Sequence, residues 1–224
     1  LDASPLRSWF DQAGILICRM PGGTTARFGA ALKGGHNAEH HNHNDVGSYV
    51  VVVGNVPVLL DPGAEEYTAR TFSSRRYESK VLNSFGHPVP VVAGCLQSPG
   101  AECRGKVLES TMLDTLDTLK LDLASCYPDA KGLKSLTRTF AFSREGDGSL
   151  RVRDEFEFDG PKEFGSALIT QDRFDRADML RWMFFEQYNH EPNIATLRFW
   201  LLYVGERNLA ELQRHQLLPK RMAG

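Results

Sequence analysis

The stretch "GSYVVVVGNVPVLLDPG", residues 47–63, contains two apolar runs that flank the pair Gly54-Asn55. Glycine and asparagine readily adopt the positive φ angles that a tight hairpin turn requires, and β-branched valines favour strands. The segment therefore predicts an antiparallel hairpin with strands near residues 48–53 and 56–60.

Similar patterns extend outward from this hairpin, from about residue 14 to residue 170. In "SLRVRDEFEFDG" (149–160) apolar and charged side chains alternate, so that one face of a strand is core and the other is solvated. The apolar set is Leu150, Val152, Phe156 and Phe158. Segments 113–127 and 136–144 alternate in the same way, and Gly146 to Gly148 mark a further turn. We therefore expect residues 1–170 to form an antiparallel β-sandwich.

The pattern changes in residues 171–224, where apolar residues recur three and four positions apart, as in amphipathic helices. We expect a first helix with a stripe of Leu180, Phe184 and Tyr188, a second that Pro192 opens and that holds Leu197 and Leu201, and a third from about Asn208 to Leu217. The predicted fold class is thus mainly β, an antiparallel β-sandwich followed by a short α-helical C-terminal segment.

Composition argues against several functions. The chain has 26 basic and 28 acidic residues, a formal net charge of -2 and no concentrated basic patch, so nucleic-acid binding is not expected. No apolar run approaches the roughly 18 residues of a membrane span. The cysteines Cys18, Cys95, Cys103 and Cys126 form no Cys-x-x-Cys pair, which argues against a zinc ribbon. We expect buried thiols, with one disulfide if the protein is exported.

The segment "HHNHND", residues 40–45, concentrates groups that bind metals. If it is extended, His41, His43 and Asp45 share one face, while Asn42 and Asn44 point away. Imidazole and carboxylate together suit zinc. His43 is therefore a candidate ligand.

Further candidate ligands lie downstream, at Asp61 in "LLDPG" and His87 in "NSFGHPVP". The predicted hairpin pairs Asp61 with Ser48, five residues beyond His43, so the chain must bend back at Gly47. Two other interpretations are open. The histidines and asparagines can form a solvated loop. A cupin-like metal barrel also uses His-x-His, but Gly47 and Ser48 stand where its acid should be.

Several motifs in one order resemble the C-terminal β-sandwich of the heparinase II/III-like family of polysaccharide lyases. They are "HHNHNDVGSYVVVVGNVPVLLDPGAEEY", "RRYES", "NSFGHPVPVVAGCLQ" and "KSLTRTFAFSR". The resemblance covers roughly residues 14–170. It implies that His43, Asp61 and His87 bind a structural zinc ion beside the active-site cleft. It also implies that His41 reaches into that cleft to contact substrate or assist catalysis.

Lyases of this kind cleave uronic-acid polysaccharides by β-elimination, in which a base removes the proton next to the carboxylate and an acid protonates the leaving oxygen. The resemblance implies that a tyrosine and a second histidine come from an N-terminal (α/α) toroid, which residues 1–40 do not resemble. We expect an acidic polysaccharide substrate, a periplasmic or secreted parent protein and an almost inactive isolated chain. The alternative is a noncatalytic carbohydrate-binding or structural metal-binding sandwich.

The tail has a separate resemblance. "RADMLRWMFFEQYNHEPNIATLRFWL" is similar to the first helices of the C-terminal domain of bacterial glutathione transferases, over residues 172–224. No segment supplies the thioredoxin-like half, so transferase activity is not expected. The tail is either a true fusion or a joined fragment, with a seam between "SALIT" and "QDRFDRAD". Alternatively, an amphipathic helix packs Leu180, Trp182 and Phe185 on the sandwich without transferase ancestry.

Overall fold

The computed structural model describes residues 5–25, 27–63, 65–170, 187–189 and 194–203. Over these residues the secondary structure consists of strands and short 3-10 turns, with no α-helix. Within the same part of the chain, no helical segment has the length and apolarity needed to span a bilayer. The prediction of a mainly β protein is confirmed.

The first sheet contains the predicted hairpin. Its five strands lie in the order β1-β2-β3-β5-β6, all antiparallel. They are β1 (Arg7–Phe10), β2 (Ile15–Arg19), β3 (Phe28–Lys33), β5 (Tyr49–Val53) and β6 (Val56–Leu59). Val53 pairs with Val56 across the turn, where Gly54 has a φ of 64°. A bulge then places Val51 opposite Leu59, one residue further along than an unbroken ladder would.

The second sheet has the order β14-β12-β11-β10-β9. Its strands are β9 (Lys106–Met112), β10 (Leu116–Asp122), β11 (Leu133–Ser143), β12 (Ser149–Phe158) and β14 (Gln187–Asn189). β9 to β12 form an antiparallel meander, and β14 joins β12 in parallel. Gly146 and Gly148 have positive φ angles in the turn between β11 and β12, as their positions predicted.

Smaller elements complete the fold. β13 (Lys162–Thr170) pairs with β7 (Pro90–Val92) and with β15 (Ile194–Tyr203). β4 (His36–Asn37) pairs with β8 (Gly100–Arg104). The 3-10 turns are η1 (Ala69–Phe72), η2 (Arg76–Glu78), η3 (Ser84–Gly86) and η4 (Ala124–Cys126). A disulfide joins Cys103 on β8 to Cys126 in η4, whereas Cys18 and Cys95 are free.

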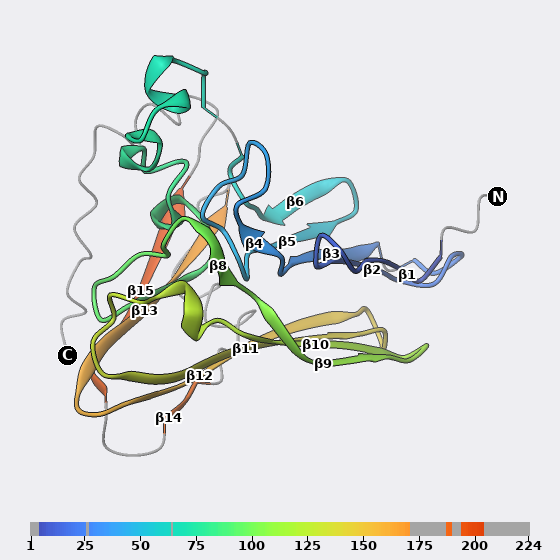
Figure 1. Ribbon diagram of the computed structural model, residues 1–224. Coiled ribbons are helices and arrows are strands. Elements are labelled where there is room, and N and C mark those ends of the chain that lie inside the picture. Colours follow the sequence, from blue (N-terminus) through green and yellow to red (C-terminus); the bar gives the residue numbers. More distant parts are fainter. Residues whose placement is uncertain (1–4, 26, 64, 171–186, 190–193, 204–224) are drawn as a thin grey trace.

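The two large sheets pack face to face, one above the other in Figure 1. Phe28 of the first sheet stacks on Phe142 of the second, with ring centroids 5.3 Å apart. Tyr49 meets Phe140 edge to face at 5.8 Å. A single buried cluster of apolar side chains draws on both sheets, and each large member contributes about 1.5–3 kcal/mol through burial. The arrangement is therefore the expected sandwich of antiparallel sheets.

The expected helical C-terminal segment is not supported. Leu197 and Leu201, predicted on a second helix, lie on strand β15, and Tyr188 lies on β14. Leu180 and Phe184 of the first predicted helix and all of the third helix lie outside the described residues. A short apolar run cannot be assigned to helix or strand by its period alone, and "IATLRFWLLY" is rich in β-branched and aromatic residues. Parallel pairing of this run with β13 agrees with that composition.

Candidate metal centre

The histidine-rich segment forms a loop between β4 and β5 and contains two turns. In the first turn the amide of Asn42 donates to the carbonyl of Glu39 at 3.3 Å, and His41 has a φ of 60°. This left-handed backbone is uncommon for a residue with a side chain. The expected extended segment, with His41, His43 and Asp45 on one face, is therefore wrong at His41.

The second turn lies at Gly47, where the sequence predicted that the chain bends back. The amide of Ser48 donates to the carbonyl of Asp45 at 2.9 Å, and Gly47 has a φ of 87°, as glycine does at the third position of a type II turn. The amide of Gly47 donates to the carbonyl of Lys33 at 2.8 Å. This turn places Asp45 beside the end of β6.

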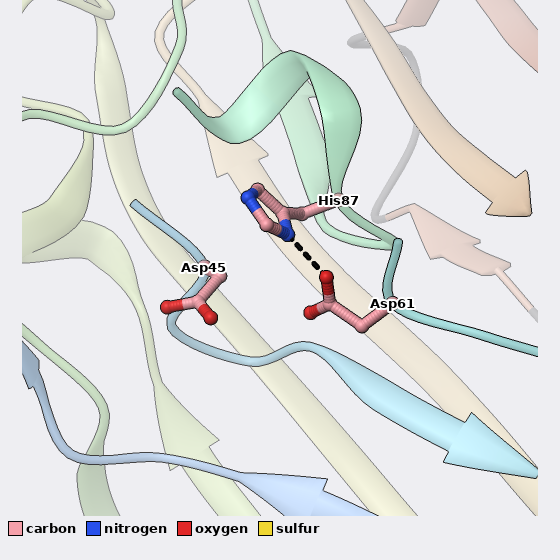
Figure 2. A group of neighbouring side chains, drawn as sticks. All are labelled: Asp45, Asp61 and His87. Carbon is pink, nitrogen blue, oxygen red and sulfur yellow. Dashed lines mark hydrogen bonds and ion pairs between the residues drawn. The ribbon is translucent and has the colours of Figure 1, made fainter. Parts of the chain in front are cut away.

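Asp45, Asp61 and His87 converge from three separate loops (Figure 2). Each offers one potential ligand atom, and these atoms lie within 4.8 Å of one another. Nδ1 of His87 lies 2.5 Å from Oδ1 of Asp61. Nε2 of His87 is buried and has no hydrogen-bond partner, which is rare for a buried polar atom. The group can therefore hold a metal ion.

His43 borders this group. Its ring centroid lies 5.2 Å from that of His87, with the rings tilted by 52°. Burial, followed by the proximity of His87, lowers the pKa of His43. A neutral imidazole retains the lone pair that a metal requires. His43 is thus available as a ligand, although the tightest group of three contains Asp45 in its place.

Groups that can carry positive charge lie beside the two carboxylates. Lys33 Nζ lies 2.5 Å from Oδ1 of Asp45. Burial opposes ionisation of Asp61, but hydrogen bonds from His87 and Ser48 and the charge of His87 lower its pKa overall. Burial likewise opposes protonation of His87, but its contact with Asp61 raises its pKa. The contact between Nδ1 of His87 and Oδ1 of Asp61 thus lowers the pKa of the acid and raises that of the imidazole.

The donor types fit a divalent cation. Two carboxylates balance a double positive charge, and imidazole nitrogens are typical ligands of transition metals such as zinc. The sequence motifs predicted His43, Asp61 and His87 as metal ligands but gave no such role to Asp45. Its place at the end of the His-x-His-x-Asp pattern was the signal for it. These donor types do not by themselves select zinc over other divalent ions.

His41 lies in a different environment, beside Tyr67. The two rings are stacked with centroids 5.8 Å apart, and the Tyr67 hydroxyl lies 3.4 Å from Nδ1 of His41. Phe72 meets Tyr67 edge to face at 5.5 Å. Tyr67 and Phe72 are 45% and 70% exposed, and His41 is also exposed. His41 is thus accessible to a ligand and makes its ring contact with Tyr67, a residue that sequence analysis did not single out.

A family model described as "Heparinase II/III-like, C-terminal" matches residues 2–82. The match includes His41, His43, Asp45 and Asp61 and ends before His87. No curated protein sequence matches the chain. The family match supports the resemblance seen in the motifs over the first part of the sandwich.

Solved structures share the fold. A mutant of the heparan sulfate lyase HepC from Pedobacter heparinus is 16% identical, with a TM-score of 0.55, and the match covers 70% of this chain and 23% of that one. A heparinase III is 18% identical at a TM-score of 0.51, with 70% and 23% covered. A heparinase III with methylated lysines is 12% identical at 0.55, with 70% and 22% covered. The chain thus spans under a quarter of the length of these proteins. None of these matches supports the glutathione transferase resemblance.

Proposed function

We propose that this chain is the C-terminal β-sandwich of a heparinase II/III-like polysaccharide lyase and that it binds a structural zinc ion. The observation that carries the proposal is the convergence of Asp61 and His87, two predicted ligands far apart in sequence, at one partly buried site with Asp45. The family match over residues 2–82 and the shared sandwich fold support it.

The proposed ligands are His43, Asp61 and His87, with Asp45 as the fourth group. Two imidazoles and two carboxylates supply four ligands, the coordination number of most structural zinc sites. The unpartnered Nε2 of His87 supports a ligand at this point. Bound zinc would supply a structural cross-link between the three loops.

His41 is the proposed contact to substrate. Its side chain is exposed, its backbone is left-handed, and its ring is stacked on that of Tyr67. Backbone strain of this kind is often retained at functional sites. In β-elimination an imidazole can accept or donate the transferred proton, and proton-transfer groups contribute roughly 10²–10⁴-fold in rate. The remaining groups would come from an N-terminal toroid, and the substrate would be an acidic, uronic-acid-containing polysaccharide.

Zinc content tests the metal site. We would measure zinc by elemental mass spectrometry in the purified protein and in His43→Ala, Asp61→Ala and His87→Ala variants. His40→Ala is the matched control, because His40 is an exposed neighbour in the same cluster. We expect one equivalent in the parent and the control and a loss in the other three variants. A well-folded parent protein without zinc would contradict the proposal.

Activity tests the role of His41. A longer protein that includes the toroid should release unsaturated uronides, which absorb in the ultraviolet, and His41→Ala should reduce this rate by at least about 10²-fold. The isolated chain should be nearly inactive. Binding of polysaccharide without turnover would instead favour a noncatalytic carbohydrate-binding sandwich, a role that the exposed rings of Tyr67 and Phe72 also suit.

The disulfide between Cys103 and Cys126 supports a periplasmic or secreted location, because such bonds persist mainly in oxidising compartments. Retention of the bond in protein isolated under thiol-blocking conditions would test this. We assign no function to residues 172–224, and their similarity to a glutathione transferase stays a prediction.

A further inference from the structure

Arg138 is a fully buried cation in the core of the sandwich, within the motif "KSLTRTFAFSR". It lies on β11 directly opposite Asp154 on β12. Its Nε and Nη2 donate to the two carboxylate oxygens of Asp154, each at 2.7 Å. The second N–H of Nη2 donates to Ser166 Oγ at 3.2 Å. This bidentate pair fixes the plane of the guanidinium.

The two remaining N–H groups of Arg138 reach out of the second sheet to two loops. Nη1 donates to the carbonyl of Gly47 at 2.9 Å and to that of Pro88 at 2.8 Å. Gly47 belongs to the turn that begins at Asp45, and Pro88 follows His87 directly. All five guanidinium N–H groups therefore have partners. One of these partners directly follows His87, and another lies in the turn that begins at Asp45.

We propose that Arg138 is a positioning residue for the metal centre: its guanidinium clamps the Gly47 and Pro88 carbonyls and thereby holds Asp45 and His87 at the spacing that a metal requires. The proposal rests on the proposed function for the presence of the metal. Arg138 itself does not contact the ligand atoms.

The chemistry of the site favours this role over simple stabilisation. A buried ion pair gains little stability over apolar residues of similar volume, because both charges must be removed from water. Arginine is required for the clamp, because lysine offers three donors from one nitrogen and cannot chelate a carboxylate while bonding two carbonyls in the same plane. The guanidinium also lies over Tyr49, 5.9 Å from its ring centroid.

Arg144 provides a matched control within the same chain. Its side chain is 2% exposed, and it also joins a buried carboxylate to backbone carbonyls. Its partners are Asp117 and the carbonyls of Leu6, Arg19 and Leu113. None of these adjoins Asp45, Asp61 or His87 in sequence. A lysine at position 144 therefore perturbs a similar network without touching the clamp.

The experiment compares the full chain with Arg138→Lys, the double variant Arg138→Met/Asp154→Leu and the control Arg144→Lys. The double variant removes both charges, so it avoids an uncompensated buried ion if Arg138→Lys folds poorly. Zinc affinity is measured by chelator competition. Amide hydrogen exchange is followed by mass spectrometry over residues 43–48 and 86–89, in metal-free protein.

We expect zinc affinity to fall about 10–100-fold in both Arg138 variants, the usual effect of removing an outer partner of a metal site, and to stay unchanged in Arg144→Lys. Exchange should accelerate in residues 43–48 and 86–89 in the Arg138 variants alone. Equal zinc affinity in the Arg138 variants and the control would overturn the positioning role, even if exchange changed. A folded parent without zinc would instead contradict the proposed function, and the exchange data would then decide whether Arg138 holds the two loops.

Discussion

Replacing Gly47 by alanine should perturb both the stability of the sandwich and the turn that presents Asp45. Gly47 has a φ of 87°, in the left-handed region that costs a residue with a side chain about 1–2 kcal/mol. The new Cβ would also lie 3.0 Å from Cδ1 of Leu123. Overpacking of a core position costs about 1–3 kcal/mol. We therefore expect Gly47→Ala to lower the free energy of unfolding by about 2–5 kcal/mol, the sum of the two effects.

Gly54→Ala is the matched control for Gly47→Ala. Gly54 has a similar φ of 64°, but an added Cβ would meet no heavy atom within 4 Å. Only the backbone term applies, so the expected loss is about 1–2 kcal/mol. The difference between the two variants therefore isolates the contact with Leu123.

Urea unfolding followed by circular dichroism measures both changes, as a shift in midpoint at constant slope. A Leu123→Ala background tests the contact directly, because removing Cδ1 should reduce the cost of the alanine at position 47. Equal losses for Gly47→Ala and Gly54→Ala, or no coupling to Leu123, would refute this account of the turn.

Three further predictions concern the core. Replacing Cys103 and Cys126 by serine should lower the free energy of unfolding by about 3 kcal/mol, because the disulfide closes a loop of intermediate length, with a separation of 23 residues. An unchanged urea midpoint would argue against this bond. Burial, followed by the charge of Asp117, raises the pKa of the Cys18 thiol to about 12. At roughly pH 8, iodoacetamide should therefore label Cys95 and spare Cys18. Labelling of Cys18 before Cys95, detected by mass spectrometry, would contradict the burial of Cys18. Asp154→Asn should lower the free energy of unfolding by about 3–5 kcal/mol, because it leaves the buried charge of Arg138 uncompensated. Glu157→Gln, in the exposed pair with Lys134, should shift the urea midpoint little. Similar shifts in the two variants would contradict the burial of the Arg138–Asp154 pair.

Much of the β-structure could be predicted because it depends on local properties of the chain. The Gly54-Asn55 turn and the alternation in β12 follow from φ preferences and from the period of two along a strand. In the same alternation, residues 138 and 154 fall on the core-facing side of their strands, and both are buried. A cation and an acid on the buried phase of two neighbouring strands were a signal of an ion pair that the sequence analysis missed.

The candidate site was predicted only in part. The types and order of His43, Asp61 and His87 predicted metal-binding chemistry, but the extended conformation considered for residues 41–45 is not adopted at His41. The turn at His41, in which the amide of Asn42 donates a hydrogen bond to the carbonyl of Glu39, separates His41 from the others. The role of Asp45 depends on the turn at Gly47, which the sequence permitted but did not place against the loop of His87.

The sequence by itself determined that the sandwich is built of antiparallel strands and which types of residue could bind a metal, because strand periods, turn chemistry and ligand types are properties of short segments. Only the tertiary structure decided which of those residues meet. The bulge in the hairpin makes Leu59 the pairing partner of Val51, and the register between β11 and β12 sets Arg138 opposite Asp154. These registers depend on packing between distant segments, so no local pattern in the chain specifies that Arg138 reaches the carbonyls of both Gly47 and Pro88.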